Sequence, residues 1–326
     1  GEQCFFATYT KSGTITRTGS ISYNVGEDEM KPVITLGSMN AKLPKSQKVA
    51  KLKCSSYNSV YDKYWMAIME DGSLYTWGRN DNGIIGNGST TSRSNPVKVL
   101  ENVKEIAVES KSSNKCVAAI SYDGELYMWG SNKHGQLGLG QTAKELPNVT
   151  VPTIVPIHDK IKKVSIAGET VAAITENNEL YMWGSDNNGR LGTDDGVNDY
   201  KNPINNDLNT PTKIMDGVSD VKISQYNTMV LSISGAVYIW GEWRSDMLGD
   251  GSDQYRSAPD LTNPIADNAK YITLSNTNAA VITEDGSLYM WGKNNYGQLG
   301  INSIQNSHKK IQTTNISDVN RVILLA

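Results

Sequence analysis

The sequence predicts an all-β fold, formed by a single domain over residues 1–326 that is assembled from repeats. A Trp-Gly pair recurs five times at intervals of 51 to 57 residues. Short strand-like segments and tight-turn sequences alternate between the pairs, and no segment has the 3.6-residue apolar period of an amphipathic helix. The pairs are Trp77-Gly78, Trp129-Gly130, Trp183-Gly184, Trp240-Gly241 and Trp291-Gly292.

Each repeat begins with two short apolar segments, which predict a first and a second strand. The first segments lie at 103–108, 161–166, 218–223 and 269–274. The second segments lie at 116–120, 170–174 and 278–282.

A tight turn then leads into a third strand that carries the Trp-Gly pair. Asp-Gly or Asn-Asn occupies the turn, and these residues tolerate the positive φ that a two-residue hairpin turn requires. A Gly-rich loop and a Pro-marked segment complete the repeat. A unit of about 50 residues with about four strands is typical of a β-propeller blade, whose two faces are both covered by neighbouring blades.

The repeat also resembles a known family. Its Asp-Gly turn, Leu-Tyr-x-Trp-Gly strand and Gly-Gln-Leu-Gly loop are similar to the repeat of the regulator of chromosome condensation family, and this similarity covers residues 49–326. Because five copies keep the same phase, the similarity is specific. It implies a propeller of four-stranded blades, usually seven in this family, and we expect a bacterial member.

The family resemblance does not fix the number of blades in this chain. We infer it by aligning the N-terminal and C-terminal segments with the repeat. Residues 4–20 align with 116–131 when one extra residue is allowed, and Thr18-Gly19 takes the place of Trp-Gly. Residues 319–324 are in phase with the first strands. We therefore predict a closed ring of six blades, with seven as the alternative, in which the C-terminal strand completes the N-terminal blade. The repeat units are about 4–53 with 319–326, 54–107, 108–165, 166–222, 223–273 and 274–318.

Bulk composition excludes several classes of function. The 31 basic and 34 acidic residues give a net charge of −3, which argues against a nucleic-acid binder. No apolar stretch is long enough to span a bilayer. Three cysteines form neither a disulfide framework nor a metal pair. We therefore predict no nucleic-acid partner, no membrane span and no metal or other cofactor.

The Gly-rich loop is not a phosphate-binding loop, because it lacks Gly-Lys-Ser/Thr and precedes no helix. Its fivefold repetition favours a structural role. His134, His158 and His308 have no partner at catalytic spacing and are interpreted as solvated loop residues. The acidic stretches 193–199 and 248–253 do not match a calcium loop, so Asx-turns are the simpler interpretation. We expect no catalytic residue and no enzymatic activity.

Departures from the repeat point to the functional residues, since the shared pattern encodes the scaffold. The link between the first two strands is lengthened in two adjacent repeats, and we expect these inserts to project side by side. A third departure, at 241–256, replaces the Asn-rich residues of the loop; the loop at 193–209 is also lengthened. The candidate partner-binding residues are Tyr57, Tyr61, Tyr64, Lys111, Lys115, Trp243, Arg244 and Tyr255.

These features favour a monomeric, non-enzymatic protein-interaction module that binds its partner through loops on one propeller face. A lectin-like propeller that stacks Trp243 and tyrosines on sugars is the alternative partner class. The family resemblance also implies guanine nucleotide exchange on the Ran GTPase or inhibition of an enzyme such as a β-lactamase. The composition, with sixteen Tyr and two Phe, suggests an exported or cell-surface protein, with a cytoplasmic location as the alternative.

Overall fold

The computed structural model of the chain shows an almost purely β structure. It describes residues 6–9, 14–18, 21–23, 32–34, 41–44, 48–54, 64–108, 115–142, 144–194, 206–242, 247–252, 255–313, 319 and 321–322. Within these ranges the only helical turns are the short 3-10 segments η1 (Asp81–Gly83) and η2 (Asn187–Gly189). None of these turns approaches the length and apolarity needed to cross a lipid bilayer.

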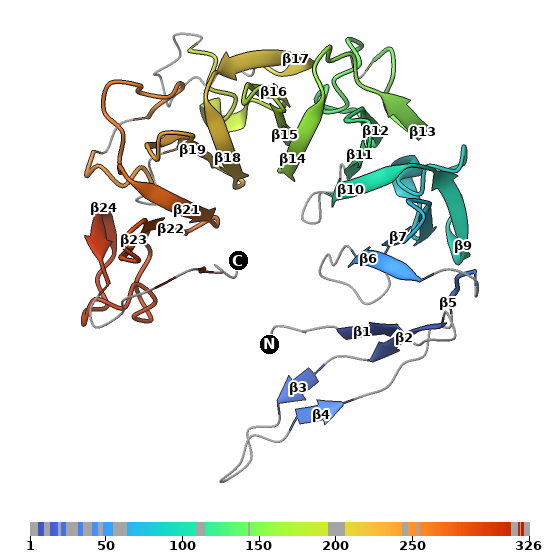
Figure 1. Cartoon of the computed structure of the whole chain (residues 1–326), viewed down its shortest axis with the longest axis horizontal. Helices are drawn as coiled ribbons and strands as arrows, with labels where there is room; N and C mark the ends of the chain where they lie inside the picture. The colour runs from blue at the N-terminus through green and yellow to red at the C-terminus, as the bar shows by residue number, and fades with distance from the viewer. Residues whose placement is uncertain are drawn as a thin grey trace.

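Five antiparallel sheets follow one another along the chain and surround a common centre, with their first strands innermost (Figure 1). Four of these sheets have four strands: β6 (Val49–Cys54), β7 (Tyr64–Met69), β8 (Leu74–Gly78) and β9 (Arg93–Leu100); β10 (Val103–Val108), β11 (Cys116–Ser121), β12 (Leu126–Ser131) and β13 (Asn148–Ile154); β14 (Ile161–Ala167), β15 (Thr170–Thr175), β16 (Leu180–Gly184) and β17 (Leu208–Met215); and β21 (Ala269–Leu274), β22 (Asn278–Thr283), β23 (Leu288–Gly292) and β24 (Ser307–Gln312). The remaining sheet has three: β18 (Val218–Ile223), β19 (Asn227–Ser232) and β20 (Val237–Gly241). The predicted all-β propeller architecture is thus confirmed.

The second strand of each sheet is buried on both of its faces. Every residue of β7, β11 and β15 is buried, because successive side chains point to opposite faces and a neighbouring sheet covers each face. Small residues such as Ala118 and Ala172 stand between larger apolar ones at these positions. This burial explains why the second strands read as continuous apolar segments in the sequence.

Each junction between sheets is built around the tryptophan of the Trp-Gly pair. The five tryptophans are at most 1% exposed. Four of them donate the indole N–H to a backbone carbonyl in the Gly-rich loop of the preceding repeat. The pairs are Trp129 with Ile84 (2.8 Å), Trp183 with Gln136 (2.9 Å), Trp240 with Arg190 (2.9 Å) and Trp291 with Met247 (2.7 Å).

The Gly-rich loop is glycine-rich because the next sheet approaches its backbone closely. A Cβ added at Gly138 would lie 2.8 Å from Nε1 of Trp183, and one at Gly135 would lie 2.7 Å from the Cα of Asn209. Both glycines also have positive φ. The structural interpretation of the loop is therefore confirmed, since its glycines make room for the next blade.

The N-terminal segment forms the degenerate repeat in part. Strands β1 (Phe6–Tyr9), β2 (Thr14–Thr18) and β5 (Ala41–Lys42) make a three-stranded sheet, beside a separate pair of β3 (Ile21–Tyr23) and β4 (Pro32–Ile34). Within the described residues this sheet has no inner strand. The predicted closure is not confirmed, because these residues form no sheet between β1 and the C-terminal segment, and the six-blade count stays a prediction.

The last Gly-rich loop, at 293–306, resembles the loops that contact the next sheet, but no described residue lies against its glycines. A Cβ added at Gly297 or Gly300 would meet no atom within 4 Å, and Tyr296 is 93% exposed. The chain nevertheless continues in phase. The N–H of Val319 donates to the carbonyl of Gly286 (3.1 Å), as the first residues of β10, β14, β18 and β21 do to the preceding turn.

Candidate partner-binding face

The strand order of each sheet brings two kinds of connection to the same end. The links join the first strand to the second, at 55–63, 109–115, 168–169, 224–226 and 275–277. The Gly-rich loops follow the third strand, at 79–92, 132–147, 185–207, 242–256 and 293–306. We call the surface formed by these links and loops the link face, and the opposite surface, formed by the hairpin turns, the turn face.

Backbone hydrogen bonds tie each link to its Gly-rich loop. A residue just after the Trp-Gly pair donates its N–H to a carbonyl at the end of the link. The four bonds are Ser131 to Lys115 (2.9 Å), Ser185 to Glu169 (2.9 Å), Glu242 to Tyr226 (3.0 Å) and Lys293 to Thr277 (2.9 Å). The links and the loops therefore form one continuous surface.

Two of the predicted partner-binding residues meet at the ends of the lengthened links. Lys115 places its Nζ 5.4 Å from the ring centroid of Tyr64, so the ends of the two links meet. That the inserts themselves project side by side stays a prediction. Tyr64 itself is 2% exposed, because it opens β7 and packs as the first residue of a buried strand. The interpretation of Tyr64 as an accessible loop residue was wrong. Tyr57, Tyr61 and Lys111 lie outside the described residues.

The third departure from the repeat coincides with an irregular sheet edge. The β18–β20 sheet has no regular fourth strand among its described residues, and two isolated bridges, Gly241 with Arg256 and Val237 with Ala266, take its place. Tyr255 is half-buried and its hydroxyl oxygen occupies the space beside Gly189, where an added Cβ would lie 2.2 Å away. It therefore packs on the neighbouring repeat. Trp243 and Arg244 lie outside the described residues.

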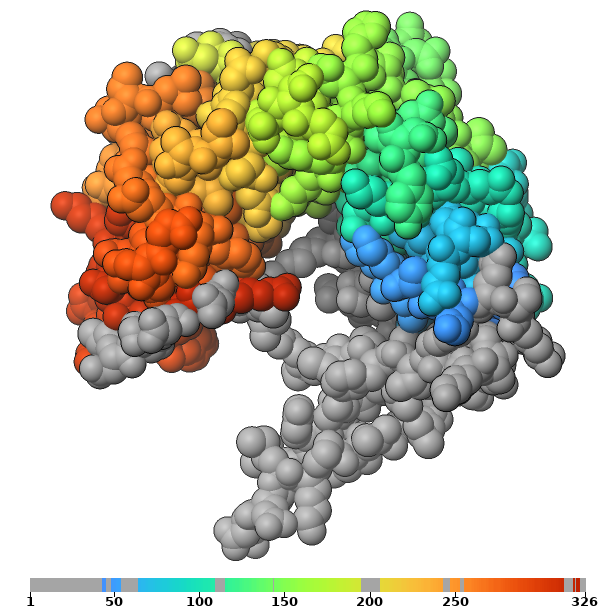
Figure 2. All heavy atoms as spheres, viewed as in Figure 1, coloured from blue at the N-terminus to red at the C-terminus, as the bar shows by residue number. Residues whose placement is uncertain are grey.

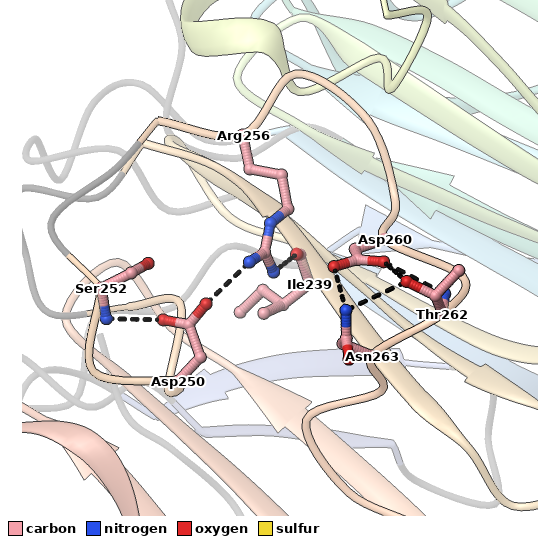
Figure 3. Close-up of polar contacts among 7 residues, drawn as sticks. All are labelled: Ile239, Asp250, Ser252, Arg256, Asp260, Thr262 and Asn263. Carbon is pink, nitrogen blue, oxygen red and sulfur yellow. Dashed lines mark hydrogen bonds and ion pairs between the residues drawn. The ribbon is translucent and has the colours of Figure 1, made fainter.

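Polar contacts fix the segment that replaces the fourth strand (Figure 3). Arg256 pairs with Asp250 (2.7 Å) and donates to the carbonyl of Ile239 (3.4 Å). The N–H of Ser252 donates to Asp250 (2.8 Å), which gives the Asx-turn predicted for this stretch. Burial acts to raise the pKa of Asp250, but hydrogen bonds from Ser252 and the charge of Arg256 outweigh it and lower the pKa.

A second carboxylate in this segment is also satisfied internally. Asp260 accepts hydrogen bonds from the hydroxyl of Thr262 (2.6 Å) and the amide of Asn263 (3.0 Å), both visible in Figure 3. These bonds hold the pKa of Asp260 at about 2. In the described part of the chain, no three His, Cys, Asp or Glu side chains are placed to hold a metal ion together.

His134 is not the solvated residue that the sequence suggested. Its Nδ1 lies 2.8 Å from Oδ2 of Asp207, and the imidazole is 23% exposed. The other oxygen of Asp207 accepts the N–H of Asp186 (3.0 Å). The hydrogen bond to Asp207 raises the pKa of His134. No local signal reveals this pair, because the two residues are 73 positions apart.

Arg190 is a buried residue of the link face that the sequence did not single out. Its side chain is nearly inaccessible, and its guanidinium donates to the carbonyls of Asn187 (2.9 Å), Gly168 (2.8 Å) and Ser224 (3.4 Å). Gly168 and Ser224 belong to the links of two successive sheets. Arg190 therefore connects these links. The equivalent position in the preceding repeat is Gln136.

Comparison with known sequences identifies a family-level match over nearly the whole chain. The family model of the RCC1-like domain matches residues 5–325. The ultraviolet-B receptor UVR8 of Arabidopsis thaliana is 28% identical over 290 residues, which are 87% of this chain and 60% of UVR8. The human E3 ubiquitin-protein ligase HERC2 is 29% identical over 245 residues, which are 73% of this chain and 5% of HERC2. The chain thus spans less than two thirds of these relatives.

Solved structures show the same fold at low sequence identity. Human WBSCR16 has a TM-score of 0.63 and 19% identity, with 95% of this chain and 79% of that chain covered. Yeast RCC1 (Prp20), in its structure with Kap60, has a TM-score of 0.67 and 15% identity, with 96% and 73% covered. Prp20p from Saccharomyces cerevisiae, a structure described with its binding to Gsp1p and histones, has a TM-score of 0.64 and 17% identity, with 96% and 75% covered.

Proposed function

The chain belongs to the family of the RCC1-like domain, and from this premise we propose that it is a non-enzymatic protein-interaction module whose partner binds the link face. One observation supports this choice of face. The largest departures in length from the repeat, at 55–63 and 185–207, are attached to strand ends at this side of the sheets, whereas the hairpin turns between second and third strands, on the opposite side, keep one length of four residues. The connections between successive regular sheets, also on the opposite side, vary less, from two residues at 101–102 to six at 155–160.

The departures matter because packing dictates the rest of the repeat. The tryptophan strand, the second strand and the core of the Gly-rich loop (83–86, 135–138 and 189–192) are buried at the junctions, so their sequences are constrained by the neighbouring sheets. Residues 55–63, 109–114, 193–205 and 243–246 depart from the repeat in sequence and are flanked by link-face residues. Additional polar and aromatic residues on one face are typical of a recognition surface.

The relatives support protein recognition as the class of function. Prp20p is described with binding to Gsp1p and histones, and yeast RCC1 was solved with Kap60. Those partners belong to those proteins, and fold similarity does not transfer them. We propose a protein partner of undetermined identity for this chain, and we retain an exported or cell-surface location as a further proposal.

Partner capture from the native source, followed by mass spectrometry, tests the choice of face. A link-face variant, Tyr57→Ala/Tyr61→Ala/Lys115→Glu, is compared with a turn-face control, Tyr122→Glu/Ile233→Glu, whose two residues are 63% and 65% exposed. We expect the link-face variant to lose the partner and the control to retain it. The opposite pattern would assign binding to the turn face.

Two assays address the alternative functions. Selective binding on a glycan array that disappears in Trp243→Ala would replace the protein partner with a sugar. Acceleration of labelled GDP release from a small GTPase would replace the non-enzymatic interpretation with nucleotide exchange. We expect neither result.

We also propose that the propeller closes as a ring of six blades. Three observations support closure: the in-phase hydrogen bond of Val319, the bare glycines of the last loop, and the missing inner strand of the N-terminal sheet. The C-terminal segment would supply that strand, and the N-terminal sheet would then cover Gly297 and Gly300. Pairing of this kind removes exposed sheet edges.

A further inference from the structure

The inner strands β6, β10, β14, β18 and β21 surround the centre of the molecule (Figure 1), and the described atoms leave a hollow there (Figure 2). These strands share one register, because the first residue of each later strand donates its N–H to the preceding hairpin turn. Val319 makes the same bond, so it takes the register position of the first residue of an inner strand. Arg321 is then equivalent to Lys51, two residues after the register point.

Charge is segregated onto these inner segments. Their described residues carry eight basic and two acidic side chains, a net charge of +6, although the whole chain carries −3. The acidic residues are Glu105 and Asp220. The basic residues are Lys51, Lys53, Lys104, Lys162, Lys163, Lys222, Lys270 and Arg321. The inner strands of an acidic protein are therefore basic.

Glu105 neutralises only part of the charge around it. Lys51 and Lys53 both approach this carboxylate, at 2.5 and 3.3 Å, from the neighbouring strand β6. The Nζ of Lys51 also donates to the carbonyl of Lys104 (3.0 Å), so this side chain crosses from β6 to β10. One carboxylate shared by two ammonium groups leaves a net positive charge at this junction.

Asp220 repeats this arrangement two junctions further along. It pairs with Lys163 of β14 and with Lys222 of its own strand (2.9 Å). The positive groups thus occur at separate junctions between sheets. Within one strand, basic residues two positions apart, such as Lys51 and Lys53, are separated by about 7 Å along the strand. Lysine on an exposed strand edge often prevents pairing with another chain. That role alone does not require an excess of eight basic over two acidic residues on the inner segments.

We propose that the central channel binds an acidic peptide segment of a partner protein. An extended polyanion matches charges that are spread around and along the inner strands, whereas a single phosphate would require groups that converge on one point. Charge complementarity of this kind would speed association and set the direction of the bound segment. The inference rests on the proposed interaction with a protein and adds the chemistry of the part that enters the channel.

Fluorescence anisotropy with a labelled poly-glutamate peptide tests this proposal. The channel variant Lys104→Gln/Lys270→Gln/Arg321→Gln removes three charges outside the described ion pairs. The control Lys98→Gln/Lys213→Gln/Lys309→Gln removes three charges from the fourth strands β9, β17 and β24, which lie outside the link face and away from the inner strands. We expect the affinity of the channel variant to fall about tenfold and that of the control less than about twofold, with all affinities lower at high salt.

Absence of peptide binding at low salt, or equal losses in both variants, would overturn the proposal. Competition by inorganic phosphate or pyrophosphate, without binding of the peptide, would replace it with a small-anion site. Thermal unfolding of both variants controls for damage to the fold. If the peptide does not bind but link-face variants still lose the native partner, only the channel inference fails and the proposed function stands.

Discussion

At the scale of single residues, Arg190 shows how one side chain can hold two repeats together. Its guanidinium donates to carbonyls of two links, and its backbone carbonyl accepts the indole N–H of Trp240. Gln136 occupies the corresponding loop position and is equally buried, so glutamine is sterically compatible with this site.

We expect Arg190→Gln to lower the free energy of unfolding by about 1–3 kcal/mol, because the carbonyls of Gly168 and Ser224 lose a charged donor. Urea unfolding gives this value. Arg79→Gln is the control, since the Arg79 side chain is 42% exposed and pairs locally with Asp81; its effect should stay within about 0.5 kcal/mol. Equal effects of the two substitutions would contradict the bridging role of Arg190.

His134 makes stability depend on pH. The pKa of the folded imidazole is raised above 6.5, so folding favours the protonated form. This contribution is fully present below about pH 6.5, the pKa of the unfolded state, and is lost as the pH rises through the folded pKa. Wild type should therefore exceed His134→Gln in stability by more at acidic pH than at pH values above neutrality.

Urea unfolding of both proteins over a pH series measures this difference. In the Asp207→Asn background the pH dependence should disappear, because the amide removes the carboxylate that favours the charged ring. A difference between wild type and His134→Gln that is constant, or that grows toward alkaline pH, would contradict the pairing of His134 with Asp207.

At the scale of elements, the Trp-Gly strand determines how sheets join. We expect Trp183→Phe to cost about 2–4 kcal/mol, because it removes the indole hydrogen bond to the carbonyl of Gln136 and removes buried volume. Denaturant unfolding measures the loss. Tyr181→Phe in the same strand is the matched control, since Tyr181 is only half-buried, and a cost as large as that of Trp183→Phe would contradict the role of the indole.

The elements themselves were largely predictable from the sequence. Strands β10, β18 and β21 have the predicted bounds, because alternating burial and Asx-Gly turns leave a period in the sequence. The fourth strand beside β20 was not predictable from that period. Only isolated bridges form there, in a segment that carries prolines at 259 and 264, whereas the regular strands β9, β13 and β17 each contain a single proline. Tyr64 was misplaced because an insert hides where a strand begins.

At the scale of the whole molecule, the last Gly-rich loop tests closure of the ring. Gly138 and Gly300 share a positive φ, and asparagine tolerates this conformation. Gly138→Asn should cost about 1–3 kcal/mol through its contact with Trp183. If the N-terminal sheet covers the last loop, Gly300→Asn should cost a similar amount in thermal or urea unfolding. A change within about 0.5 kcal/mol would instead indicate an open end.

Closure was harder to predict than the repeat because no periodic signal encodes a contact between chain ends. Thr18 stands where the other repeats have tryptophan, so the N-terminal unit is visible only by alignment. The basic charge of the inner strands, by contrast, could have been found by aligning the first strands and counting their charges. Candidate partner-binding side chains in the lengthened links could not be placed from the sequence, because these inserts have no equivalent in the other repeats with which they could be aligned.

The indole-to-carbonyl bonds across the junctions also make tryptophan fluorescence a probe of whether each junction is intact. Four tryptophans each lie at a different junction between sheets, where they are buried and hydrogen-bonded to the preceding repeat. Separation of two sheets at one junction would expose one indole to water and shift its fluorescence emission to longer wavelength. Variants that each replace one of these tryptophans with phenylalanine would therefore show, by the difference of their emission from that of the wild type during unfolding, the order in which the junctions separate.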